Sequence, residues 1–204
     1  MNKKPLLKPS RPFFSSGPCP KRPGWSASAV EKIAYLGRSH RAKKPLQQIK
    51  TLIELTGEIL ELPKGYKVAI VPGSDTGAFE LLMWSLLGKN ETTMLAWESF
   101  GNDWAEDAVN QLNLPECSVD RAGYGDLPKL TAVAGNSDIC FTWNGTTSGV
   151  RVPNANWIEK NEDRLVLCDA TSAVFSQELD WEKLDGVSFS WQKVLGGEGG
   201  HGVV

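Results

Sequence analysis

The chain has 204 residues, of which 41% are hydrophobic and 23% are charged, and its formal net charge at pH 7 is −2. This composition is close to that of average globular proteins and argues against a disordered, collagen-like or fibrous chain. No apolar run approaches the roughly 18 to 20 residues of a membrane helix, so we expect no membrane span. The N-terminus is polar and rich in proline, without the apolar segment of a secretory signal. We therefore expect a cytoplasmic protein.

The cysteines and histidines do not form a metal-binding pattern. The four cysteines are widely spaced without a C-x-x-C pair, and the histidines are His40 and His201. A zinc site needs four such ligands at close spacing, so we predict free thiols and no bound metal. The cysteines are Cys19, Cys117, Cys140 and Cys168.

Positive charge is concentrated at the start of the chain, where Glu31 is the single acid among the first 44 residues. The basic residues there are Lys3, Lys4, Lys8, Arg11, Lys21, Arg22, Lys32, Arg38, Arg41, Lys43 and Lys44. A nucleic-acid-binding arm is one interpretation. Because these residues alternate with prolines and form no recognisable binding module, we favour a positive cleft edge that attracts a small anionic substrate.

Hydrophobic periodicity predicts alternating helices and strands along the chain. The predicted helices cover residues 26–37, 45–61, 78–87 and 103–112, and the predicted strands cover residues 67–71, 92–97, 139–143, 165–169 and 187–190. This alternation is typical of an α/β fold with a mostly parallel sheet flanked by helices.

Polar or aromatic residues follow each of the predicted strands. These segments are Ser74-Asp75-Thr76, Trp104, Asn144-Gly145-Thr146-Thr147, Asp169 and Gln192-Lys193. Because ligands of such sheets bind beyond the carboxyl ends of the strands, we expect the segments to surround one site.

The segment 73–77, Gly-Ser-Asp-Thr-Gly, is read as a small-residue loop before a helix. Backbone N–H groups and the positive end of the helix dipole attract an anion there, which makes the loop a candidate phosphate cradle. The segment matches neither a Walker motif nor G-x-G-x-x-G, and an N-cap turn without a ligand explains it equally well. Asp75 is an unfavourable neighbour for phosphate, so we expect backbone groups to make any contact.

Two residues are candidates for binding a cofactor. Asp169 leaves the buried run 165–168, where an unpaired acid is unfavourable, so it either caps the next turn or holds a protonated pyridine nitrogen. Lys193, between a strand and a glycine-dense loop, is either a solvated surface lysine or a desolvated amine able to form an imine.

Three further positions allow two interpretations each. Trp104 is either part of the core or a ring that stacks on a flat cofactor. Thr146 follows Asn144-Gly145, a strong turn signal, and either closes the turn or binds a ligand. His40 and Arg41 suit an anionic substrate, although a lone histidine is more often structural.

Taken together, these segments resemble the phosphoserine aminotransferase family, pyridoxal phosphate enzymes of fold type I and class V. The resemblance covers nearly the whole chain and implies the large domain of that fold, pyridoxal 5'-phosphate as cofactor and a homodimer. It is carried by Phe14-Ser15-Ser16-Gly17-Pro18, Ser39-His40-Arg41, Asp75-Thr76-Gly77, Trp97-Glu98-Ser99-Phe100-Gly101, Trp104, the segment 142–150, Cys168-Asp169-Ala170-Thr171-Ser172 and Ser190-Trp191-Gln192-Lys193.

The resemblance implies a role for each candidate residue. Lys193 would be the catalytic residue that forms the imine and then moves a proton between substrate and cofactor. Asp169 would pair with the pyridine nitrogen, Trp104 would stack on the ring and Thr146 would bind near its phenolic oxygen.

The remaining candidates would bind phosphate or substrate anions. The residues bordering the cofactor phosphate would be Asp75, Thr76 and Gln192, and those binding substrate anions would be Arg41, His40 and Ser16. Many family members have a glycine-rich loop with an arginine where this chain has Ser74-Asp75-Thr76. Without that arginine, phosphate binding falls to backbone amides and hydroxyls.

The implied reaction transfers the amino group of L-glutamate to 3-phosphohydroxypyruvate and gives O-phospho-L-serine and 2-oxoglutarate. It belongs to serine biosynthesis, and bacterial members also serve pyridoxine biosynthesis. The alternatives are another class-V enzyme, such as an alanine–glyoxylate-type transaminase, and a non-catalytic fragment.

The resemblance also predicts the domain organisation. Residues 1–45 would form an N-terminal arm and substrate-binding segment, and residues 46–204 an incomplete cofactor-binding large domain. Because family members continue for well over a hundred residues, we expect the small C-terminal domain to be absent from this chain and the chain to be C-terminally truncated.

Overall fold

The computed structural model describes residues 6–7, 10, 19–133 and 135–204. Seven strands form one mixed sheet in the order β1-β7-β6-β5-β4-β2-β3. The strands are β1 (Ile70–Pro72), β2 (Thr92–Ala96), β3 (Cys117–Arg121), β4 (Asp138–Thr142), β5 (Val166–Asp169), β6 (Gly186–Ser190) and β7 (His201–Val203). β7 runs antiparallel to both β1 and β6, whereas β6, β5, β4, β2 and β3 are parallel to one another. β1 and β6 therefore point the same way, and the carboxyl ends of six strands lie at one edge.

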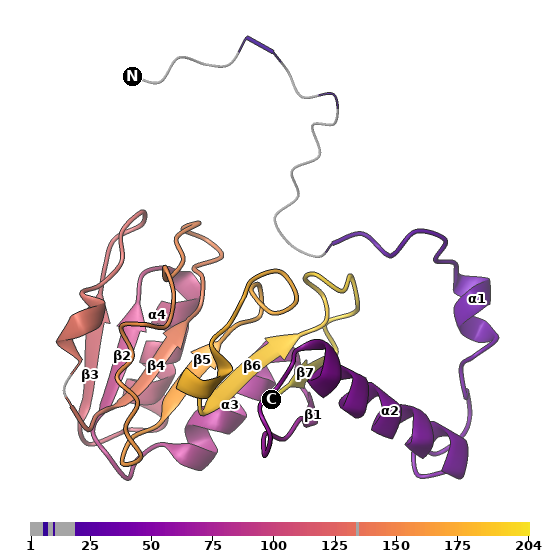
Figure 1. Cartoon of the computed structure of the whole chain (residues 1–204), viewed down its shortest axis with the longest axis horizontal. Coiled ribbons are helices and arrows are strands. Elements are labelled where there is room, and N and C mark those ends of the chain that lie inside the picture. Colours follow the sequence, from indigo (N-terminus) through magenta and orange to yellow (C-terminus); the bar gives the residue numbers. More distant parts are fainter. Residues whose placement is uncertain (1–5, 8–9, 11–18, 134) are drawn as a thin grey trace.

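Within the described residues, four α-helices accompany the sheet (Figure 1). They are α1 (Ala27–Glu31), α2 (Lys43–Ile59), α3 (Ser74–Leu86) and α4 (Ser99–Glu106), the last continuing into a π-helical turn over Asp107–Gln111. Short 3₁₀ turns cover Leu130–Ala132 and Trp181–Lys183. The first helix, expected over residues 26–37, is shorter and ends at Glu31, and the Ser26 hydroxyl caps its start by accepting a bond from the Ala29 N–H at 3.3 Å.

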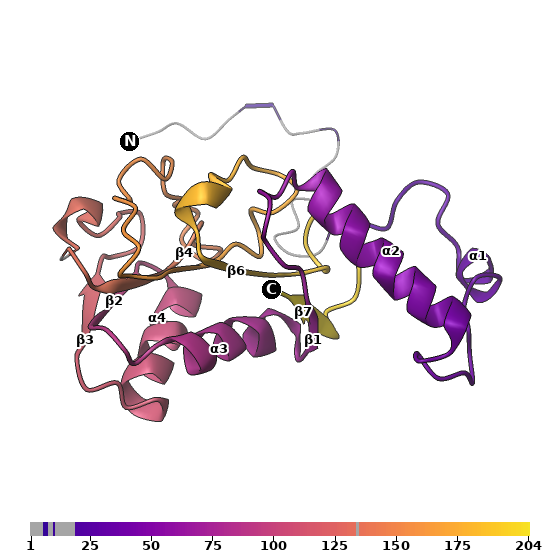
Figure 2. The ribbon, with the colours of Figure 1, turned by 60° about the horizontal axis from the view of Figure 1, so that its bottom comes forward.

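Different layers cover the two faces of the sheet. Helices α3 and α4 pack on one face, whereas long connections and short turns cover the other, as the edge-on view shows (Figure 2). Phe79, Met83 and Trp104 form the core on the helical side, and Phe141 and Trp143 belong to the larger core on the other side. This arrangement confirms the predicted α/β fold with a mostly parallel sheet.

Several element boundaries differ from the sequence-based expectations. Residues 74–76, expected in a loop, form the first turn of α3, because Gly73 turns the chain with a φ of 88°. The helix expected from residue 103 begins at Ser99, where the Glu98 side chain caps it. β3 was not predicted, because its sequence, Cys-Ser-Val-Asp-Arg, is that of a half-exposed edge strand without an apolar run.

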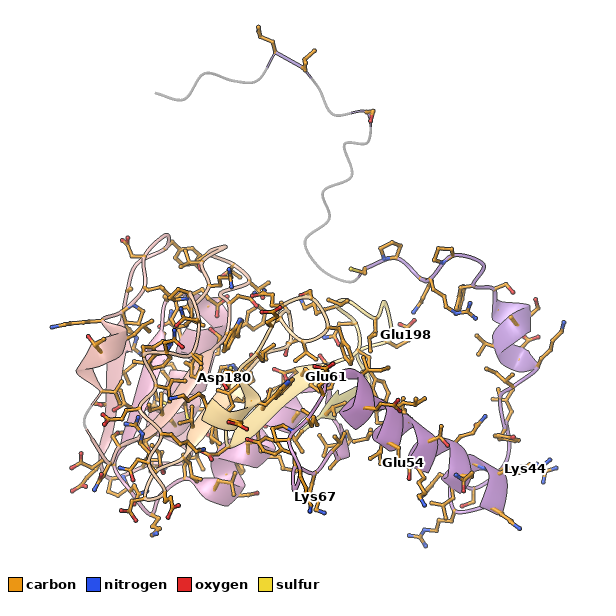
Figure 3. All side chains as sticks on the ribbon, viewed as in Figure 1. Lys44, Glu54, Glu61, Lys67, Asp180 and Glu198 are labelled. Atoms are coloured by element: carbon orange, nitrogen blue, oxygen red, sulfur yellow. The ribbon has the colours of Figure 1, made fainter. Side chains whose placement is uncertain are left out.

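The N-terminal helices stand apart from the sheet (Figure 1). Thr56 is the one buried residue of α2 within the part of the chain that the structure describes. Figure 3 labels Lys44 near the end of α2 that is remote from the sheet. Among the described residues, none of the helices has both the length and the apolar character needed to cross a membrane.

Candidate active site

A pocket opens at the carboxyl edge of the sheet, between the starts of α3 and α4 and the loop after β6. Seven residues proposed from the sequence line it: Asp75, Thr76, Trp104, Thr146, Asp169, Gln192 and Lys193. The other lining residues are Ser74, Glu98, Phe100, Thr142, Asn144, Thr171 and Ser172. The expected convergence of strand ends is therefore present.

Asp169 is held rigidly at the end of β5. Its Oδ1 accepts bonds from the Thr171 N–H at 3.0 Å and the Thr171 hydroxyl at 2.7 Å. Its Oδ2 accepts a bond from the Trp104 indole N–H at 3.1 Å. Both interpretations of Asp169 are thus structurally compatible, since it caps its own turn and also presents a carboxylate to the pocket.

Trp104 is buried between the pocket and the core. Its ring centroid lies 5.0 Å from that of Phe79 on α3. Since the indole N–H is bound to Asp169, the orientation of the ring is coupled to that of the carboxylate. Trp104 therefore belongs to the core and also lines the pocket.

The start of α3 packs closely against β7, because Gly202 has no side chain. A Cβ atom on Gly202 of β7 would overlap the Ser74 carbonyl and approach the Ala78 Cβ to 2.6 Å. Ser74 itself has a φ of 61°, a left-handed conformation that is unfavourable for a residue with a side chain. The Gln192 amide donates to the Ser74 hydroxyl at 3.3 Å, which joins the helix start to the loop after β6.

Asp75 is buried in the first turn of α3, with 8% of its surface exposed. Its Oδ1 has no hydrogen-bond partner among the described residues. Burial raises the pKa of Asp75 well above its usual value, and the negative charge of Asp169 raises it further. Asp75 and Asp169 therefore form a pair of buried acids that line the same pocket.

Lys193 enters the pocket from the loop after β6, and its side chain is half-buried. Its backbone carbonyl accepts bonds from the N–H groups of Cys19 at 2.9 Å and Gly196 at 3.1 Å. Lys21 and Glu198 form an ion pair of 2.6 Å beside it. The segment that begins at Cys19 thus helps to hold the loop that carries Lys193.

Thr146 faces the pocket at the bridge that follows β4. Its hydroxyl lies 3.1 Å from the Ser172 hydroxyl. Gly145 beside it has no room for a side chain, since a Cβ atom would lie 2.8 Å from the Trp97 indole nitrogen. Thr146 therefore lies in the turn that follows Asn144-Gly145 and also lines the pocket.

Glu98 lines the pocket but is not among the site residues that the sequence predicts. It is fully buried, and its Oε1 accepts the Gly101 N–H at 2.7 Å. Its Oε2 accepts the Thr147 N–H at 3.3 Å and the Thr147 hydroxyl at 3.1 Å. The available signal was an acid directly after a strongly apolar strand, the same signal that indicated Asp169.

His40 and Arg41 do not line the pocket of their own chain. Both are exposed in the turn between α1 and α2, a few residues before Lys44 (Figure 3). Ser16 lies outside the described residues. Of the proposed substrate-anion residues, His40 and Arg41 are therefore not brought to the other candidates within one chain.

A larger hollow, about 500 Å³, lies beside the amino-terminal end of β6. Its walls include Leu60, Tyr66, Val187 and Phe189. The side chains are mainly apolar and none of the candidate residues reaches it. The candidate cofactor-binding residues therefore lie in the smaller pocket at the carboxyl edge.

The sheet order and the position of the pocket define the fold of the fold-type-I aminotransferases. A phosphoserine aminotransferase from Cytophaga hutchinsonii matches 86% of this chain with a TM-score of 0.74 and 31% identity, and 49% of its own chain is covered. An alanine–glyoxylate aminotransferase from Nostoc sp. has a TM-score of 0.76 at 17% identity, over the whole of this chain and 55% of its own. That second likeness concerns the fold alone.

Within this class, the sequence is similar to phosphoserine aminotransferases. That of Methanosarcina barkeri is 50% identical over 201 residues, which are 98% of this chain and 54% of the relative. The resemblance indicated by the sequence motifs is thereby confirmed. The chain spans about half the length of the curated relatives it matches. No family model matches the sequence.

Proposed function

We propose that this chain provides the pyridoxal phosphate-binding part of a phosphoserine aminotransferase. The reaction would transfer the amino group of L-glutamate to 3-phosphohydroxypyruvate and give O-phospho-L-serine and 2-oxoglutarate. The observation that carries the proposal is the meeting of Lys193, Asp169 and the start of α3 in one pocket. An amine, a carboxylate and a set of free helical N–H groups are the three features that this cofactor requires.

The polar groups of the pocket fit pyridoxal phosphate. Oxygen atoms of Thr142 and Gln192 are buried there without a hydrogen-bond partner among the described residues. Such atoms are rare in folded proteins and point to a polar ligand. The first-turn N–H groups of α3 have no partners within the helix, so they can donate to a phosphate together with the hydroxyls of Ser74 and Thr76.

Pyridoxal phosphate, when bound, supplies an electrophilic aldehyde carbon and a ring that withdraws electrons from the substrate. Lys193 supplies the nucleophilic amine and moves a proton at the reacting carbon. Asp169, oriented by Thr171 and Trp104, holds a proton on the ring nitrogen. Trp104 covers the ring and keeps water from that side.

The substrate anions would be bound by His40 and Arg41, together with Ser16. Because His40 and Arg41 lie outside the pocket of their own chain, we propose a homodimer in which a second copy presents them. The division into an arm over residues 1–45 and a large domain over residues 46–204 is part of the same proposal. So are the cytoplasmic location and the use of a related phosphorylated keto acid in pyridoxine biosynthesis.

The cofactor site is tested by titrating the chain with pyridoxal phosphate and following visible absorbance. Lys193→Ala should abolish the new band, whereas Lys129→Ala, a change at an exposed lysine, should leave it unchanged. Borohydride treatment followed by peptide mapping should place the covalently attached cofactor on Lys193. Attachment to a different lysine would reject the proposed site.

A second candidate function is an alanine–glyoxylate-type transamination, an activity that the Nostoc enzyme carries on the same fold. The two are separated by comparing turnover of 3-phosphohydroxypyruvate and glyoxylate by the chain as it exists. We expect preference for the phosphorylated acid, because the segment Ser39-His40-Arg41 offers cations for its phosphate. Preference for glyoxylate would exclude the first function.

A further inference from the structure

Two acidic side chains from different elements meet in the candidate active site. Asp169 ends β5, Asp75 lies in the first turn of α3, and each is more than nine-tenths buried. The Asp75 carboxylate lies beside Asp169, with the hydroxyls of Ser188 and Thr171 as its other polar neighbours. Two carboxylates in one desolvated site cannot both hold a full negative charge without a large energetic cost.

The two carboxyl groups differ in the hydrogen bonds that they accept. Asp169 has three donors, namely the Thr171 N–H, the Thr171 hydroxyl and the Trp104 indole. Asp75 Oδ1 is buried with no partner among the described residues, and Ser188 Oγ nearby is also without one. Three donors compensate the burial of Asp169, whereas the hydroxyls of Ser188 and Thr171, which favour the charged form of Asp75, are outweighed by burial and by the charge of Asp169.

We propose that Asp75 carries the proton of this pair and acts as a positioning residue for Asp169. As a carboxylic acid it can donate its O–H toward the Asp169 carboxylate, so that one negative charge, fixed in place, receives the ring nitrogen of the cofactor. The identity of that ligand rests on the proposed function, whereas the protonation of Asp75 does not. The residue thus acts through Asp169 instead of through the cofactor phosphate.

Burial and a neighbouring acid raise the pKa of Asp75, and other titratable groups lie on the elements packed around it. Burial is the larger cause of its raised pKa and the charge of Asp169 the second. On the packed strands, Cys168 of β5 is a buried thiol whose pKa is raised well above its usual value, and His201 lies at the exposed end of β7. Glu98 and Lys193 line the same pocket.

The assignment predicts a pH-dependent stability. A carboxyl whose pKa is higher in the folded than in the unfolded chain stabilises the fold below the unfolded pKa, and this contribution is lost as pH rises through the folded pKa. Asparagine at position 75 is neutral at every pH, so the Asp75→Asn variant does not lose this contribution to stability as the pH rises. The stability of the unaltered chain relative to Asp75→Asn should therefore fall as the pH increases.

The first experiment measures urea unfolding of the cofactor-free chain and of Asp75→Asn from about pH 5 to about pH 9. The difference between the two should move steadily in favour of the variant, while Asp126→Asn, at an exposed aspartate, should show no such trend. A difference that stays constant over this range overturns the proposal. Should the variant not fold, infrared spectroscopy of the unaltered chain decides, because a protonated carboxyl band must be present at neutral pH.

The second experiment measures pyridoxal phosphate affinity by absorbance titration. Asp75→Asn, which retains a neutral hydrogen-bond donor, should bind within about twofold of the unaltered chain, and Asp75→Ala should bind about tenfold more weakly. Equal weakening by both variants would mean that the charge of Asp75 is required, and would overturn the proposal. If the unaltered chain binds no cofactor, the proposed function fails, but the unfolding experiment still tests the protonation of Asp75.

Discussion

At the scale of single residues, Glu98 shows how one buried carboxylate organises the pocket. Its two oxygens accept three bonds, from the Gly101 N–H and from the N–H and hydroxyl of Thr147. Glutamine has one acceptor oxygen and cannot serve both sides. We expect Glu98→Gln to lower the free energy of unfolding by about 1 to 3 kcal/mol, measured by urea denaturation.

Glu106 provides the matched control for that change. It lies at the end of the same helix, α4, and is exposed in an ion pair of 2.9 Å with Arg121. Exposed pairs contribute about 0 to 1 kcal/mol, so Glu106→Gln should cost less than Glu98→Gln. Equal losses in the free energy of unfolding would show that the buried hydrogen bonds of Glu98 stabilise the fold no more than the exposed ion pair of Glu106.

The residues of the site were predictable from sequence to different degrees. Asp169, Lys193 and Gln192 follow apolar strands directly, so their place at the carboxyl edge followed from the sheet topology. The direction of the Asp75 side chain was not predictable, because the sequence does not say that Ser74 begins the helix. That start depends on the φ values of Gly73 and Ser74 and on the close approach of β7.

At the scale of elements, the contact between α3 and β7 positions the end of the pocket that we propose binds the cofactor phosphate. Gly202→Ala would place a Cβ against the Ser74 carbonyl, a backbone group that cannot move without shifting the helix. We expect a loss of about 1 to 3 kcal/mol in the free energy of unfolding, together with weaker cofactor binding in absorbance titration.

Gly200→Ala is the control for the same strand region, because a Cβ there meets no atom within 4 Å. It should leave both stability and cofactor affinity nearly unchanged. If Gly202→Ala also had no effect, the tight packing of α3 on β7 would not be needed to form the site.

Elements were predictable where they are buried. β2, β4 and β5 are buried along their whole length, and their apolar runs identified them. The edge strands β1 and β3 carry weaker hydrophobic patterns, because each pairs with a neighbouring strand on one side only and its other edge has no partner strand. β7 has three residues, His-Gly-Val, and runs antiparallel, so it is too short for a hydrophobic period and does not follow the alternation of helices and parallel strands.

At the scale of the whole molecule, α2 exposes apolar side chains that the described residues leave uncovered. Leu52, Leu55 and Ile59 are 41%, 45% and 63% exposed and recur at helical spacing on one side of the helix. Apolar stripes of this kind on a projecting element are typical of protein interfaces. In the proposed homodimer, a second copy covers this stripe and presents its His40 and Arg41.

Changing Leu55 to aspartate tests that arrangement. A charge in the centre of the stripe should weaken self-association at least about tenfold, because a buried interface disfavours an unpaired carboxylate. Leu46→Asp is the matched control, since Leu46 is also exposed on α2 but lies nine residues away, on the opposite side of the helix. Sedimentation equilibrium measures the association of each chain, and absorbance titration should show unchanged cofactor affinity, because α2 does not line the pocket. If the unaltered chain stays monomeric at every concentration, or if both variants weaken association equally, the stripe is not the dimer interface, and the proposal that a second copy presents His40 and Arg41 loses its support.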